Sequence, residues 1–146
     1  MSSSKLVDLV LECVEQVSHL EDKNVKRSFR ARARQIPSDI HTMGFAYAIT
    51  ILASRSNSSV IDLGLAIESC KDLVDKIMGL NMDSIKKGYA LYAAILVHVL
   101  KRSGIVDANR FSELVRQSMS SIALDTHSLN AALWIKRFTE AYIYED

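Results

Sequence analysis

Apolar side chains recur every three or four positions along most of the chain, which is the spacing of one face of an α-helix. The clearest case lies between Lys5 and Leu20. Its apolar stripe consists of Leu6, Leu9, Val10, Cys13 and Val17. This stretch therefore predicts an amphipathic helix that packs one side against the rest of the protein.

The same period predicts further helices. A second runs from about Asp22 to Gln35 and stops before Pro37, because proline disfavours helical geometry in the residue that precedes it. The others are expected over about 38–55, 60–78, 84–102, 107–123 and 126–144, with Ser58 or Ser59 capping the fourth and Gly79 ending it. The sequence contains no sustained strand alternation and no hairpin turn. We therefore expect an all-α fold, a single compact bundle of six to seven helices.

The stretch Tyr89–Val97 contains no charged residue and lies inside the helix expected from Asp83 or Ser84 to about Arg102. A helix that is apolar nearly all round is surrounded by other helices. We expect its side chains to form the centre of the core. The candidates are Tyr89, Leu91, Tyr92, Ile95, Leu96 and Val99.

Composition favours one domain. Of the 146 residues, 49% are hydrophobic and 24% charged, which is enough to fill one core and still cover it with a polar surface. No Pro/Gly-rich linker divides the chain, so we expect a single domain over residues 1–146. Cys13 and Cys70 have no CxxC spacing and each lies in an apolar helical pattern, so we expect buried reduced thiols.

Neither a secretory signal nor an apolar run long enough to cross a bilayer is present. The run Leu6–Leu11 is broken by Asp8, and the longest apolar stretch, Tyr89–Leu100, is interrupted by His98. We therefore expect a cytoplasmic protein that does not contact a membrane.

Catalytic patterns are missing from the sequence. There is no glycine-rich phosphate loop and no nucleophile elbow, and none of the four histidines has a second His or Cys three or four residues away. The histidines, His19, His41, His98 and His127, lie in different elements. We expect no enzyme activity, no catalytic residue, no metal site and no cofactor.

Positive charge is concentrated in the second helix, which contains six of the chain's 18 Lys and Arg residues and no acidic residue after Asp22. Counted at about 100° per residue, its cations fall within an arc of about 100°. They are Lys23, Lys26, Arg27, Arg30 and Arg34. The apolar residues Val25, Phe29, Ala33 and Ile36 cover a separate arc, so one side packs while the other presents a row of charge.

Like charges at this spacing repel, and a phosphate backbone that releases its counterions is a natural partner for them. Two alternatives stay open. The row is a solvated face paired with acids of the first helix, or it docks an acidic protein, which makes the chain a helical protein–protein scaffold.

The last helix has an apolar face that includes Ala131, Trp134, Ile135 and Phe138, with Lys136 and Arg137 away from its centre. A tryptophan on an apolar stripe is usually part of a core, so we expect Trp134 to be buried.

Two segments resemble a known family. Phe29–Phe45 contains a basic helix that ends in a proline, followed by an apolar helix with an early glycine. Leu133–Ala141 contains an aromatic residue, two basic residues, a phenylalanine and a closing Glu-Ala. In order and spacing they are similar to the small subunit of the type III-B CRISPR (Cmr) RNA-guided effector complex.

The resemblance implies a non-catalytic, all-helical subunit that functions in antiviral defence. Copies of it stack along a ribonucleoprotein, contact other Cmr subunits, and line the groove that holds the crRNA and its target RNA. Residue by residue, it assigns RNA contacts to Arg30, Arg34, Lys136 and Arg137. Lys23, Lys26 and Arg27 rest on the helical wheel alone.

Overall fold

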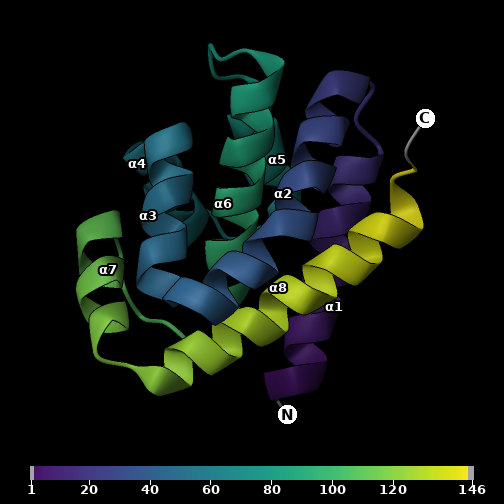
Figure 1. The fold of residues 1–146 in the computed structure, drawn as a ribbon. Coiled ribbons are helices and arrows are strands. Elements are labelled where there is room, and N and C mark those ends of the chain that lie inside the picture. Colours follow the sequence, from purple (N-terminus) through teal and green to yellow (C-terminus); the bar gives the residue numbers. More distant parts are fainter. Residues whose placement is uncertain (1, 145–146) are drawn as a thin grey trace.

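The computed structural model describes residues 2–144, and these form eight helices without a strand (Figure 1). The predicted all-helical class is confirmed, whereas the predicted count of six to seven is too low. The helices are α1 (Ser2–Ser18), α2 (Lys23–Met43), α3 (Phe45–Arg55), α4 (Ser58–Ala66), α5 (Cys70–Met78), α6 (Ser84–Arg102), α7 (Phe111–Met119) and α8 (Ile122–Tyr142).

Helix α6 is the central element, with α2, α3, α4 and α5 arranged around it and α8 crossing α1 and α2 (Figure 1). Its N-cap is Asp83, whose carboxylate accepts a hydrogen bond of 2.8 Å from the amide of Lys86. Every residue from 90 to 100 is buried. Five of the six predicted core side chains are fully buried, while Tyr89 is only partly so. The charge-free stretch therefore forms the middle of the core, as predicted.

The predicted end of the second helix before Pro37 is wrong, because α2 continues through Pro37 to Met43. Proline costs one backbone hydrogen bond inside a helix. Here Ile36, Pro37 and Ile40 are all buried, so packing of this face offsets that cost. The helix ends at Gly44, whose positive φ of 87° suits glycine and turns the chain into α3.

The predicted fourth helix is in fact two helices, α4 and α5, separated at residues 67–69. Helix α4 is capped by Asn57 rather than by Ser58 or Ser59. Ser69 caps α5 by accepting a hydrogen bond of 3.1 Å from the amide of Asp72. The predicted end at Gly79 is confirmed.

The last two helices have different bounds from those predicted. Helix α7 begins only at Phe111, because the Nζ of Lys101 holds the carbonyls of Asp107 (2.9 Å) and Ala108 (2.8 Å) in a non-helical segment. Helix α8 begins at Ile122, earlier than predicted, with Ser121 accepting a hydrogen bond of 3.0 Å from the amide of Leu124.

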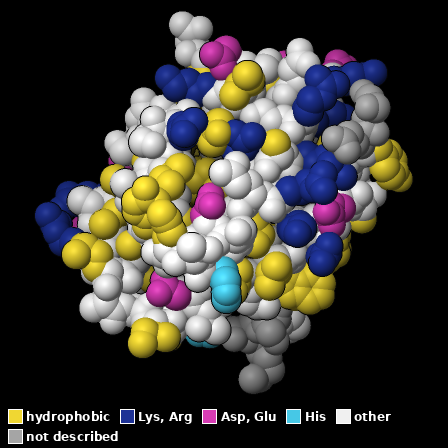
Figure 2. Space-filling model, in the orientation of Figure 1, with side chains coloured by type: hydrophobic (Ala, Val, Ile, Leu, Met, Phe, Trp, Pro, Cys, Tyr) yellow, Lys and Arg dark blue, Asp and Glu magenta, His cyan; other side chains and the backbone are white. Residues whose placement is uncertain are grey.

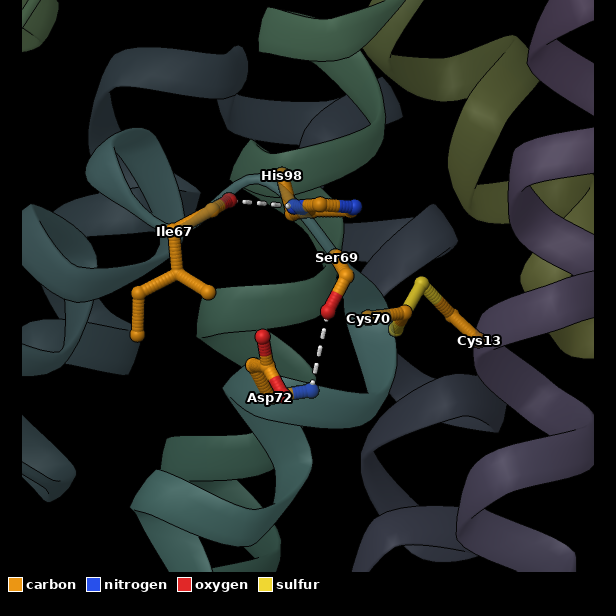
Figure 3. Close-up of a disulfide and its surroundings, with 6 residues drawn as sticks. All are labelled: Cys13, Ile67, Ser69, Cys70, Asp72 and His98. Atoms are coloured by element: carbon orange, nitrogen blue, oxygen red, sulfur yellow. Dashed lines mark hydrogen bonds between the residues drawn. A yellow bond between two sulfur atoms is a disulfide. The ribbon is translucent and has the colours of Figure 1, made fainter.

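Cys13 of α1 and Cys70 of α5 form a disulfide, with their Cα atoms 5.3 Å apart (Figure 3). The predicted burial is correct, but the predicted reduced state is wrong for this structure. The two cysteines are 57 residues apart in the sequence. Their spacing therefore carries no signal, and only the packing of α1 beside α5 brings them together.

None of the helices in the described part of the chain is both long enough and apolar enough to cross a membrane.

Candidate nucleic-acid interface

All five cations predicted on the second helix line one hollow in the surface, with a volume of about 280 Å³. We call Lys23, Lys26, Arg27, Arg30 and Arg34 the basic row. The opposite side of α2 is buried through Val25, Phe29, Ala33 and Ile36, as the helical pattern predicted. Figure 2 shows Lys and Arg side chains gathered along the side of the molecule where α2 and the end of α8 lie. The structure thus concentrates positive charge at one place.

The rest of the hollow comes from Ala31 of α2 and from Tyr142, Ile143 and Tyr144 at the end of α8. The Nε of Arg30 donates a hydrogen bond of 3.0 Å to the carbonyl oxygen of Ile143. On the other side, the hydroxyl of Tyr142 donates one of 3.0 Å to a carboxylate oxygen of Glu15, which raises the pKa of that tyrosine. These two bonds fix the end of α8 to both α2 and α1, so the hollow has a defined wall.

Three members of the basic row make further contacts. Lys26 donates to the carbonyl of Ser18 at 3.3 Å, and Arg27 donates to the side chain of Asn24 at the same distance. The Nε of Arg34 lies 3.7 Å from a carboxylate oxygen of Glu140 on α8, and the side chain of Arg34 is 52% exposed. The contacts of Arg27 and Arg34 are exposed and therefore weak, so these two side chains are able to exchange them for a ligand.

Glu140 connects Arg137 to the basic row. Its carboxylate accepts a hydrogen bond of 3.0 Å from Arg137 and also faces Arg34. Arg137 therefore lies at the edge of the charged surface, although it does not line the hollow. Lys136, the next residue back on α8, does not line it either. Of the seven predicted contacts, the structure brings five into the hollow and a sixth beside it.

Arg32 is the remaining cation of α2, and it does not line the hollow. Its guanidinium carbon lies 4.0 Å from the centre of the Tyr89 ring on α6. On the helical wheel Arg32 falls about 180° from Lys23, which agrees with its place outside the basic row. It supports the packing of α2 on α6.

The aromatic side chains at the end of α8 were not predicted as part of the site. Tyr142 is 39% and Tyr144 80% exposed, and both line the hollow. Trp134, predicted to be in the core, is 38% exposed and packs on Phe138 with the ring centres 5.5 Å apart. Exposed aromatic rings beside cations are typical of surfaces that bind single-stranded nucleic acid. No sequence pattern indicated the two tyrosines, because they reach the hollow only through the crossing of α8 over α2.

The sequence model of one protein family, described as CRISPR-associated protein (Cas_Cmr5), matches residues 3–142. No curated protein and no solved structure matches the chain.

Proposed function

Because the chain belongs to the Cmr5 family, a family of subunits of the type III-B CRISPR (Cmr) effector complex, we propose that it is a non-catalytic RNA-binding subunit of that complex. The basic row follows the sugar–phosphate backbone of the crRNA and its target. Copies of the chain stack beside one another and beside other Cmr subunits, so that their basic rows line one continuous groove. The role of the complex is antiviral defence.

One observation supports RNA binding above all others: five cations from a single helix face line the same hollow. They extend from residue 23 to residue 34, or about 16 Å along the helix axis. A row of this length suits an extended polyanion better than a single phosphate group. Each contact with a phosphate releases condensed counterions, which is the main source of affinity for nucleic acid.

The side chains of this surface also suit a protein that binds RNA without regard to its sequence. Phosphate contacts position a nucleic acid, whereas contacts with base edges specify it. In guide-dependent complexes, base pairing supplies the sequence specificity and the protein contacts the backbone. Tyr142 and Tyr144 add rings that stack equally well on any base.

The test is RNA affinity as a function of salt. We compare the wild type with the triple variant Arg27→Gln, Arg30→Gln, Arg34→Gln, both as isolated chains and within the assembled complex. If each arginine contacts a phosphate of single-stranded RNA, the slope of log affinity against log salt falls by about 2. Glutamine keeps a high helix propensity, so α2 persists.

The matched control removes three charges elsewhere: Arg55→Gln, Lys76→Gln and Arg116→Gln. These residues are exposed, lie on α3, α5 and α7, and do not line the hollow. The control keeps the wild-type slope if the basic row binds RNA. Equal slopes for both triple variants and the wild type would exclude RNA binding by this row. If the basic-row variant keeps the wild-type slope but no longer assembles with an acidic Cmr subunit, the result supports the scaffold function instead.

A further inference from the structure

A second group of side chains, none of which lines the hollow, has the chemistry of metal ligands. Cys13 of α1, Cys70 of α5 and His98 of α6 each place one potential ligand atom within 4.8 Å of the other two. All three are buried, with exposed fractions of 0%, 3% and 1%. No sequence pattern indicates this group, because its members are 57 and 28 positions apart. Its chemistry is independent of the proposed RNA binding.

The ring of His98 is oriented by a backbone contact. Its Nδ1 lies 3.2 Å from the carbonyl oxygen of Ile67. A carbonyl only accepts hydrogen bonds, so Nδ1 carries the proton and the lone pair is on Nε2. Figure 3 shows Nε2 pointing away from Ile67, on the side where the two cysteines lie. A Nδ1–H bonded to a backbone carbonyl is the usual support for a histidine that binds metal through Nε2.

The cysteines are also placed suitably. Cys70 is the first residue of the nine-residue helix α5, directly after its N-cap Ser69. The partial positive charge of a helix N-terminus stabilises a thiolate. Two thiolates and one divalent cation sum to zero charge, which suits a site surrounded by the apolar core.

We propose that, after reduction of the disulfide, Cys13, Cys70 and His98 bind one zinc ion. The ligands are the two sulfur atoms and Nε2 of the imidazole, and the fourth position of the tetrahedron takes a water molecule. A cellular dithiol supplies the two electrons and two protons that convert the disulfide into two thiols and is itself oxidised to a disulfide. Zinc then displaces one proton from each thiol.

Little movement is needed. With Zn–S bonds of about 2.3 Å and a tetrahedral angle, two sulfur atoms that share a zinc ion lie about 3.7 Å apart. The same geometry puts each sulfur about 3.5 Å from the histidine nitrogen. The second separation lies within the present 4.8 Å limit of the group, and the two sulfur atoms move apart to the first once the bond between them is reduced. Zinc thus replaces the covalent link between α1 and α5 and adds α6 to it.

The experiment uses the full chain, reduced with a phosphine and freed of metal with a chelator. Zinc is titrated by competition with a chromophoric chelator, and cobalt is used as a spectroscopic substitute. The reduced wild type binds one zinc per chain, and its cobalt form shows the near-ultraviolet absorption of thiolate coordination. The oxidised wild type binds none.

Variants assign the ligands. Cys13→Ser, Cys70→Ser and His98→Gln each weaken zinc binding at least about ten-fold relative to the reduced wild type. His127→Gln is the matched control, because His127 is exposed on α8, and it leaves zinc affinity unchanged. Circular dichroism establishes that each variant is folded.

Two results overturn the proposal. The first is that the reduced wild type binds no stoichiometric zinc. The second is that His98→Gln binds zinc as tightly as the wild type, which would mean that the cysteines hold an adventitious ion only. If His98→Gln does not fold, zinc X-ray absorption of the reduced wild type decides. Two sulfur neighbours and an imidazole support the site, and any other ligand set rejects it.

Discussion

Arg30 and Ile143 are 113 positions apart in the sequence, yet the guanidinium Nε of the first donates a hydrogen bond of 3.0 Å to the carbonyl oxygen of the second. This bond joins the middle of the basic row to the segment that follows α8. Arg30 therefore contributes positive charge to the basic row and also holds the segment after α8 that forms the wall of the hollow.

The single variants Arg30→Gln and Arg27→Gln separate these tasks. Arg27 donates a hydrogen bond of 3.3 Å to the side chain of the nearby Asn24, and because this contact is exposed, its loss costs little stability. A hydrogen bond from a charged group contributes about 1.5 kcal/mol or more, so Arg30→Gln lowers the melting temperature by about 3–6 °C. Differential scanning calorimetry measures both. Equal melting temperatures would show that the bond to Ile143 contributes nothing to stability.

Glu140 pairs with both Arg34 and Arg137, so its neutralisation tests the proposed RNA binding. If the basic row binds RNA as proposed, Glu140→Gln removes a negative charge that would repel a phosphate approaching Arg34. Because an exposed ion pair contributes about 0.2–1 kcal/mol, we expect RNA affinity to rise about 1.4- to 5-fold at low salt and to approach the wild-type value at high salt.

Glu113→Gln is the control for this change. Glu113 pairs with Arg110 at 3.4 Å, also three positions away, but on α7 and apart from the hollow. Its neutralisation leaves RNA affinity close to that of the wild type. An equal gain in both variants would mean that net charge alone sets the affinity.

The disulfide closes a loop of 57 residues. From the chain entropy that such a loop removes from the unfolded state, its reduction lowers the free energy of unfolding by about 4 kcal/mol. Urea denaturation with and without a reductant, in the presence of a metal chelator, measures the difference. In the variant Cys13→Ser the reductant has no effect on stability.

Gly88 allows α2 and α6 to lie in direct contact. A Cβ atom at this position would overlap the side chain of Ser28 and lie 2.8 Å from the backbone nitrogen of Phe29. Gly88→Ala therefore forces the two helices apart, at a cost of about 1–3 kcal/mol. Gly79→Ala is the matched control, since an added Cβ there meets no atom closer than 3.5 Å. Thermal denaturation of the two variants compares them.

Helical periodicity predicted the central helix within one residue at its start and placed the five members of the basic row on one face. Both depend on the local order of residues, which the sequence displays. The helix breaks were harder, because tertiary contacts decide them. Pro37 remains helical where its neighbours are buried. Asp125 of α8 accepts a hydrogen bond of 2.8 Å from the amide of Phe45 and so supports the start of α3 from 80 positions away.

Site residues that come from distant parts of the sequence could not be predicted either. Tyr142 and Tyr144 join the basic row only because α8 crosses α2, and Glu140 meets Arg34 for the same reason. Cys13, Cys70 and His98 come from three helices. No spacing rule applies to side chains that only the folded arrangement of helices brings together.

The shared wall of the hollow has a practical consequence for recombinant work. Residues 142–144 line the charged surface, whereas the start of α1 lies at the opposite end of the molecule (Figure 1). A purification tag fused after α8 begins beside the arginines of the hollow, and an acidic tag there competes with a polyanion for them. Binding measurements should therefore use protein whose tag is fused before α1 and not after α8.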